Sequence, residues 1–259
     1  MASAIILNIP HSSTVIPAPF KKLFTIEEPE LYQELLNMTD WYTDELFDQG
    51  IGKAIIAPVS RLVCDTERFS HDEDEPMAKR GMGFFYTHGS KKQRIKEETT
   101  TLKDEALWRY YASHHIKLID TTEEALIEWK KALIIDCHSF SSVPLPYEME
   151  QSDDRPDICI GTDDFHTPKV LSSLALEYFQ SKGYKTVANY PYSGSIAPLR
   201  HYGKNANVSS IMIEINRGLY LKPGTNEKND NFNKIKKDIL DFEIVSKEAL
   251  MSSCISPMP

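Results

Sequence analysis

Six short runs of mostly apolar, often β-branched residues recur along the chain and predict β-strands. Several runs are apolar at consecutive positions, which is typical of central strands that helices cover on both faces. The runs are AIILNIP (4–10), KAIIAPV (53–59), KALIIDCHS (131–139), DICIGT (157–162), KTVANY (185–190) and SSIMIEIN (209–216). The pattern therefore predicts a sheet with a layer of helices on each side.

Between these runs, apolar residues recur at helical spacing. One stripe comprises Leu31, Leu35, Met38, Tyr42 and Leu46, and an interruption is expected in it near residues 37–39. Further helices are expected at about 102–130, 168–181 and 230–250, with Gly183 just past the end of the second of these. Strands that alternate with helices in this way predict a three-layer α/β fold.

The stretch 69–96 follows neither period clearly. Its central part is charged and contains three glycines. A loop of this length in a compact domain is usually functional or mobile, so we expect this stretch to be a candidate cover for a site. Neither a repeat nor a low-complexity linker marks a boundary, and we expect one domain over residues 1–259.

Composition narrows the function classes. The 259 residues carry a net charge of −9, which disfavours nucleic acid as a partner because phosphate binding needs a dense basic face. No run approaches the roughly 20 apolar residues of a membrane span, so no membrane partner is expected. The four cysteines lie far apart in the sequence and predict free thiols in a reducing compartment, which favours a cytoplasmic protein: Cys64, Cys137, Cys159 and Cys254.

Two histidines lie at the ends of predicted strands. His11 follows the run 4–10, and His138 lies at the end of the run 131–139. Ligands gather at the carboxyl ends of strands in α/β sheets, which makes both positions suitable for metal ligands. Asp136 lies two residues before His138 and projects to the same side of a strand, where a carboxylate can orient a ligating imidazole. Ordinary hydrogen-bonded surface histidines are the alternative.

Glu214 interrupts an apolar strand. The isoleucines at 211, 213 and 215 are expected to face one way and Glu214 the other. A carboxylate in such surroundings is rarely buried without a partner, and burial would raise its pKa toward the range that suits a general base. An ion pair with Arg217 or another arginine is the alternative role.

Asp40, in MTDWYTDEL, lies near the expected interruption of the first helix. An aspartate there is commonly an N-cap or a first-turn carboxylate. The competing interpretation makes it the oxygen ligand of a zinc site that two histidines complete. Such a site keeps its fourth position open for water.

Arginines are candidate substrate anchors. Arg61 and Arg68 flank a predicted short strand in SRLVCDTERF, and together they could bind carboxylates and polarise a carbonyl. Surface salt bridges are the alternative for each of them, and also for Arg200 and Arg217. His114 lies on an apolar helix stripe and is expected to be a packed core histidine. The sequence lacks the H-E-x-x-H, Walker, G-x-S-x-G and dinucleotide glycine motifs, which removes most nucleotide-dependent and serine-hydrolase classes.

Seven motifs in a fixed order identify a family resemblance. They are IPHSSTVIP, MTDWYTDELF, SRLVCDTER, IIDCHS, GTDDF, SGSIAPLRHYG and IMIEINRGLYL. Over about residues 8–221 the chain resembles the N-formylglutamate amidohydrolase family, which is similar in fold and site to zinc carboxypeptidases and aspartoacylases. The resemblance implies a three-layer α/β/α sandwich with a mixed, mostly parallel sheet of eight strands around one catalytic zinc ion.

The same resemblance implies roles for individual residues. His11 and His138 would be zinc ligands, and Asp40 would be the carboxylate ligand. The H-x-x-E motif of carboxypeptidases is absent, because Thr14 stands where that motif has its glutamate. Glu214 would be the general base. Arg61 would polarise the carbonyl, and the candidates for substrate binding are Arg68, Arg200, His201, Tyr202 and Arg217. The implied reaction is hydrolysis of N-formyl-L-glutamate to formate and glutamate, so the partner is a small-molecule substrate.

Two departures from the family pattern affect the substrate. Glu67 stands where the family commonly has an asparagine, and an anion that pointed inward there would repel a substrate carboxylate. The glycine pair before the H-Y-G motif is altered to Ser193-Gly194-Ser195. Hydrolysis of another N-acyl amino acid or of a short peptide is therefore the alternative activity. A metal-free binding module on the same fold is the alternative from another class.

Overall fold

The sheet contains the six strands that the sequence predicts. The structure, a computed structural model, describes residues 3–252, and its strands are β1 (Ile5–Ile9), β2 (Lys53–Ile56), β3 (Ala132–Phe140), β4 (Ile158–Gly161), β5 (Thr186–Ala188) and β6 (Val208–Asn216). They form one sheet in the order β2-β1-β3-β6-β4-β5. All neighbouring pairs are parallel except β4 and β6, which are antiparallel. The expected mixed, mostly parallel sheet is confirmed.

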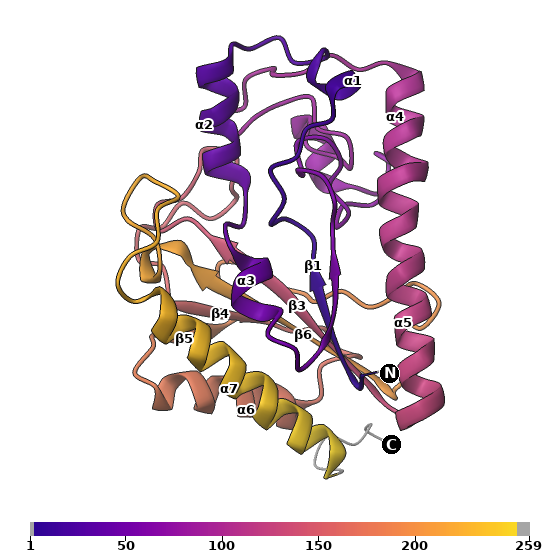
Figure 1. Cartoon of the computed structure of the whole chain (residues 1–259), viewed down its shortest axis with the longest axis vertical. Helices are drawn as coiled ribbons and strands as arrows, with labels where there is room; N and C mark the ends of the chain where they lie inside the picture. The colour runs from indigo at the N-terminus through magenta and orange to yellow at the C-terminus, as the bar shows by residue number, and fades with distance from the viewer. Residues whose placement is uncertain (1–2, 253–259) are drawn as a thin grey trace.

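Helices cover both faces of this sheet (Figure 1). They are α1 (Ala18–Lys21), α2 (Glu28–Met38), α3 (Thr43–Phe47), α4 (Thr100–Ala106), α5 (Ser113–Trp129), α6 (Lys169–Ser181) and α7 (Phe232–Met251), with the short 3₁₀ helices η1 (Pro76–Arg80) and η3 (Arg217–Leu219) and the π-helix η2 (Leu107–Ala112). Residues of α3, α6 and α7 share one apolar cluster with one face of the strands. Residues of α5 pack with β1, β2, β3 and β6 on the other face. The three-layer α/β prediction is confirmed.

Two strand predictions are wrong. The described residues form a sheet of six strands rather than eight, and other extended segments make isolated bridges, such as that between Phe24 and Lys96. The residues between Arg61 and Arg68 also form turns. Side chains there satisfy local backbone amides: Ser60 Oγ accepts from Leu62 N, and Asp65 Oδ1 accepts from the backbone N of Glu67. Such local bonds compete with a strand ladder.

The first helical stripe breaks where the sequence predicts. Helix α2 ends at Met38, and α3 begins at Thr43 after Tyr42, whose φ of 63° places it in the left-handed region. The extended backbone of Thr39 ends α2, and the left-handed Tyr42 is the N-cap residue from which α3 starts in a new direction. Asp40 therefore lies in the break, with its backbone amide hydrogen-bonded to the carbonyl of His11.

The stretch 69–96 is anchored rather than free. The buried carboxylate of Glu34 accepts hydrogen bonds from Ser90 N and Gln93 Nε2, each at 2.7 Å. The ammonium of Lys96 is buried and donates to the carbonyl of Leu62. The stretch carries Tyr86 into the interior, where its side chain is fully buried. It therefore contributes a side chain to the interior beside the histidines.

The described cysteines Cys64, Cys137 and Cys159 are buried free thiols, as predicted, whereas Cys254 lies outside the described residues. Within residues 3–252, every helix is too short or too polar to cross a bilayer.

Candidate active site

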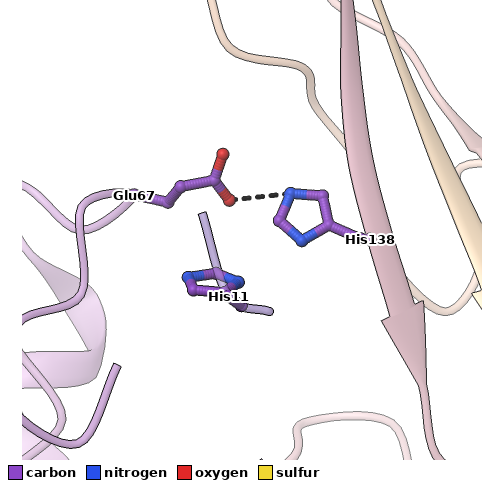
Figure 2. Close-up of side chains that lie close together, drawn as sticks. All are labelled: His11, Glu67 and His138. Atoms are coloured by element: carbon purple, nitrogen blue, oxygen red, sulfur yellow. Dashed lines mark ion pairs between the residues drawn. The ribbon is translucent and has the colours of Figure 1, made fainter. Parts of the chain in front are cut away.

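Two histidines meet at the carboxyl ends of adjacent parallel strands. His11 follows β1 and His138 lies near the end of β3, and the register pairs Asn8 of β1 with Asp136 of β3. The two imidazole centroids are 5.1 Å apart, and the residues are only 2% and 4% exposed. Figure 2 shows the carboxylate of Glu67 directed to His138, with the ring of His11 close to both. The structure thus brings together the two histidines that the strand ends predict.

Asp40 lies against both rings. Its Oδ2 atom is 3.1 Å from Nδ1 of His138 and 3.6 Å from Nδ1 of His11. The guanidinium of Arg217 lies 3.4 Å from the other oxygen, Oδ1. The carboxylate is therefore fixed from one side by Arg217 and faces the Nδ1 atoms from the other.

The opposite nitrogen of each ring also meets a carboxylate. His11 Nε2 is 2.8 Å from Asp65 Oδ1, and His138 Nε2 is 3.1 Å from Asp136 Oδ1. The predicted pairing of Asp136 with His138 is confirmed. A carboxylate on the far nitrogen fixes the tautomer and the orientation of a metal-binding imidazole. The Nδ1 atom of His11 is buried and has no hydrogen-bond partner within the described part of the chain, so this donor set fits a metal ion.

Glu67 adds a further potential ligand. Its Oε2 atom is 2.9 Å from His138 Nε2, and the ligand atoms of His11, Glu67 and His138 lie within 4.8 Å of one another. These three residues can therefore hold a metal ion. The sequence singled out Glu67 only as a departure from the family pattern. No pattern in the sequence marks its position, because the turn that carries Glu67 follows no period.

The electrostatics favour charged imidazoles in the metal-free site. Burial alone would lower the pKa of His138, but the carboxylates of Glu67, Asp136 and Asp40 raise it well above the ordinary value. Burial and Arg61 likewise lower the pKa of His11, yet its carboxylate neighbours raise it overall. A cation that replaced these protons would meet the same negative surroundings.

Glu214 lies on β6 beside His138 of β3, its partner in the register. The isoleucines at 211, 213 and 215 belong to the cluster on the α7 face, so Glu214 faces the other way, as predicted. Burial raises the pKa of Glu214 to about 8, with Asp40 adding to the effect and His138 opposing it. Its Oε2 atom is buried and accepts no hydrogen bond from any described residue. A carboxyl group with these properties suits proton transfer.

Asp65 joins the arginines to the histidines. Its Oδ2 atom accepts hydrogen bonds from Arg61 Nη2 at 2.8 Å and from the Tyr86 hydroxyl at 2.6 Å, and Arg68 Nε lies 3.6 Å away. Arg61 and Arg68 therefore converge, as expected. The guanidinium of Arg61 and the charge of His11 keep the pKa of Asp65 well below its ordinary value despite burial. Arg68 Nε is buried and lacks a hydrogen-bond partner among residues 3–252.

The remaining candidates divide into two groups. Arg217 reaches the site through Asp40. Arg200 and His201 instead pair with Glu123 of α5, at 3.4 and 3.2 Å, and the half-exposed Tyr202 donates to Asp163. Their contacts therefore lie away from the two histidines.

Comparison with known proteins adds a decisive observation. A family model for N-formylglutamate amidohydrolase matches residues 3–221. The chain belongs to the N-formylglutamate amidohydrolase family. The match covers every residue of the site described above, whereas α7 lies beyond it.

Two solved structures have the same fold as this chain. An N-formylglutamate amidohydrolase from Ralstonia eutropha JMP134 superposes with a TM-score of 0.84 at 22% sequence identity, covering 97% of this chain and 95% of that chain. A gene product from Agrobacterium tumefaciens gives a TM-score of 0.68 at 16% identity, covering 96% and 91%. The search of curated proteins found no match.

Several residues of this family member were missed from the sequence. Asp65 accepts hydrogen bonds from both Arg61 and Tyr86, and Asn8 donates to both Asp136 and Glu67. Asn8 stands in an otherwise apolar strand run, AIILNIP, and a buried amide there was a signal that polar partners lie on the neighbouring strand. Tyr86 gave no such signal, because an aromatic residue in FFYTHG is equally typical of a core.

Proposed function

We propose that this chain is a zinc-dependent amidohydrolase that converts N-formyl-L-glutamate and water to formate and glutamate. One observation supports this most: two buried histidines present Nδ1 atoms to Asp40 while carboxylates hold both Nε2 atoms, beside a buried Glu214. The family model and the fold of the Ralstonia enzyme support the choice of N-formylglutamate.

The proposed zinc ligands are His11 Nδ1, His138 Nδ1 and Asp40 Oδ2. Asp65 and Asp136 already occupy the Nε2 atoms, and His11 Nδ1 lacks a partner in the described structure, so the Nδ1 side favours the metal. The competing set of His11, Glu67 and His138 has suitable spacing. In that set, the His138 nitrogen nearest to Glu67 is Nε2, which Asp136 also contacts. The Asp40 set is therefore preferred.

The protein groups then divide the proton transfers. A bound zinc ion would supply a Lewis acid that polarises the formyl carbonyl and makes water more acidic. Glu214 accepts the proton of the attacking water and passes it to the leaving amine as the C–N bond breaks. Arg61, held by Asp65, stabilises the negative charge that develops on the carbonyl oxygen.

The arginines also suit an acidic substrate. Arg68 keeps a buried Nε donor that makes no hydrogen bond within residues 3–252, and it is assigned to a substrate carboxylate. Glu67 does not oppose this assignment. Its oxygens are directed to Asn8 Nδ2 at 2.7 Å and to His138 Nε2, away from the arginines. The roles of Arg200, His201 and Tyr202 in substrate binding stay predictions.

Two measurements on the purified protein test this proposal together: zinc content, and formate release from N-formyl-L-glutamate with and without a chelator. About one zinc per chain and chelator-sensitive release are expected. Zinc without formate release would move the substrate to another N-acyl amino acid or a peptide, which rates on N-acetylated and peptide substrates would identify. A protein with neither zinc nor activity would be a binding module.

A further inference from the structure

A chain of buried hydrogen bonds runs from helix α5 to the far side of His138. His114 Nε2 is 2.7 Å from Asn8 Oδ1, and Asn8 Nδ2 is 2.8 Å from Asp136 Oδ1 and 2.7 Å from Glu67 Oε1. Asp136 and Glu67 both meet Nε2 of His138, at 3.1 and 2.9 Å. Neither His114 nor Asn8 touches the zinc ligands directly in these contacts.

The partners fix the direction of every bond. Asp136 and Glu67 present carboxylate oxygens, so the Asn8 atom that faces them must be its NH₂ group, which has two hydrogens to give. The Asn8 carbonyl oxygen then faces His114, whose Nε2 must carry a proton. Burial lowers the pKa of His114 to about 3 and so keeps the ring neutral, and the acceptor Asn8 Oδ1 places its single proton on Nε2. Donation therefore runs from His114 through Asn8 to the carboxylates of Asp136 and Glu67, which accept the Nε2–H of His138 from the other side.

The backbone fixes this chain of hydrogen bonds at two points. Asn8 and Asp136 are register partners on β1 and β3, so their side chains share one face. His115, next to His114, reaches the carbonyl of Thr66 at 2.8 Å and so holds the turn that carries Glu67. The π-helix η2 directly precedes the two histidines, and such segments are frequent at functional sites.

We propose that His114 and Asn8 are positioning residues for the metal site, acting through Asp136 and Glu67 on Nε2 of His138. Three side chains that are each 3% exposed or less, those of His114, Asn8 and Asp136, act together with the partly buried Glu67 on one imidazole nitrogen, Nε2 of His138. The chain keeps Nδ1 of His138 turned to Asp40. In this arrangement Glu67 acts as a second carboxylate support for His138. The inference rests on the proposed zinc site but extends it by two residues that make no contact with metal or substrate.

The test compares His114→Leu and Asn8→Leu with the wild type by chelator competition for zinc. Each variant removes a link of the chain, and loss of such outer partners typically lowers metal affinity about 10–100-fold. His114→Gln retains an amide donor and is expected to recover most of the affinity. Thr122→Val is the matched control, since Thr122 is buried on the same helix and its hydroxyl donates to the Leu118 carbonyl, outside the chain of bonds described above. Circular dichroism and thermal melts check that each variant is folded.

A spectroscopic readout separates positioning from general destabilisation. The Nε2–H proton of His138 should give a resolved, slowly exchanging NMR signal in the wild type, His114→Gln and Thr122→Val proteins, and lose it in His114→Leu and Asn8→Leu. Folded leucine variants that keep this signal and bind zinc within about twofold of the wild type would overturn the inference. Equal loss of affinity in Thr122→Val would do so too.

The failure of the proposed function has a different signature. A wild-type protein that binds zinc but releases no formate refutes the substrate and leaves the affinity comparison intact. A wild-type protein that binds no zinc refutes the metal site, and the NMR signal in the metal-free protein then decides alone whether His114 and Asn8 position His138.

Discussion

Two buried glutamates on opposite faces of the sheet differ in what surrounds them. Glu214 faces the histidines from β6, and Glu243 projects from α7, whose residues pack on the other face. Burial raises the pKa of both carboxyl groups, to about 8 and about 9. Glu214 has the charges of His138, Asp40 and Arg217 around it, whereas only Asp48 contributes at Glu243.

The difference shows why a raised pKa does not by itself mark a catalytic group. Both oxygens of Glu243 lack hydrogen-bond partners among the described residues, and the nearby Ser246 hydroxyl lacks one as well. Such an isolated carboxyl group costs stability when it ionises and offers no chemistry. Glu214 shares its burial but lies beside groups that can position water and substrate. The groups around each carboxyl group, and not its pKa alone, therefore indicate whether it can take part in catalysis.

The largest contrast is expected in turnover. Glu214→Gln removes the proton acceptor, and we expect kcat for formate release to fall about 10²–10⁴-fold with zinc content unchanged. Glu243→Gln makes the same chemical change on the other face and should leave kcat unaltered. Steady-state assays with metal analysis on both variants measure the contrast. Equal losses in the two variants would remove the distinction between the faces.

The next contrast lies within the site face, between Asp40 and Glu67, which meet opposite nitrogens of His138. Asp40→Asn should lower zinc affinity more than about 100-fold, because Asp40 faces Nδ1 of both histidines. Glu67→Gln should lower it about 10-fold, as expected for a group that supports the far nitrogen. Competition with a chelator measures both affinities. The reverse order would make Glu67 the ligand and Asp40 the support.

Much of this arrangement follows from local sequence patterns. Short apolar runs predicted all six strands, since a strand buried on both faces is apolar at consecutive positions. Helical periodicity predicted the break at Asp40, since burial of one face of a helix imposes its period on the residues. The strand-end position of His11 and His138 gave the centre of the site. These signals are local in the sequence and so can be read from it.

The rest depended on contacts between distant segments. Glu67 reaches His138 and Asn8 because the turn after Arg61 folds back over β1, and no periodic pattern encodes such a turn. The predicted strand there was wrong because Ser60 and Asp65 side chains satisfied the backbone locally. Tyr86 reaches Asp65 from a stretch without a period, so only the structure places it.

A smaller effect is expected on stability when Glu243 of α7 is replaced. Glu243→Gln should raise the free energy of unfolding by about 1–3 kcal/mol at pH 8, because it removes a carboxyl group that the fold forces to stay protonated. Urea denaturation measures the change. Glu248→Gln, at an exposed position of the same helix, is the control and should stay within about 0.5 kcal/mol of the wild type. No gain at Glu243 would mean that the fold stabilises its charge.

The smallest effect is the change in the free energy of unfolding per pH unit. The Glu243→Gln variant isolates the contribution of Glu243 to it. The pKa of Glu243 rises from 4.5 to about 9 on folding, so the native state keeps a proton that the unfolded chain releases, and stability falls as pH rises between these values. Lys96 has the opposite sign: burial lowers its pKa from 10.5 to about 7, so its contribution increases with pH between 7 and 10.5.

Between pH 5 and 7, therefore, Glu243 contributes to the pH dependence of stability and Lys96 does not. One group contributes at most about 1.4 kcal/mol per pH unit, and Glu243→Gln should remove that share of the downward slope. Above pH 7, the same variant should uncover the upward slope of Lys96, which Lys96→Met would abolish. Urea melts at pH 5, 6, 7 and 9 measure both. An unchanged slope from pH 5 to 7 in Glu243→Gln would show that this carboxylate has found a partner, which would make the two faces alike.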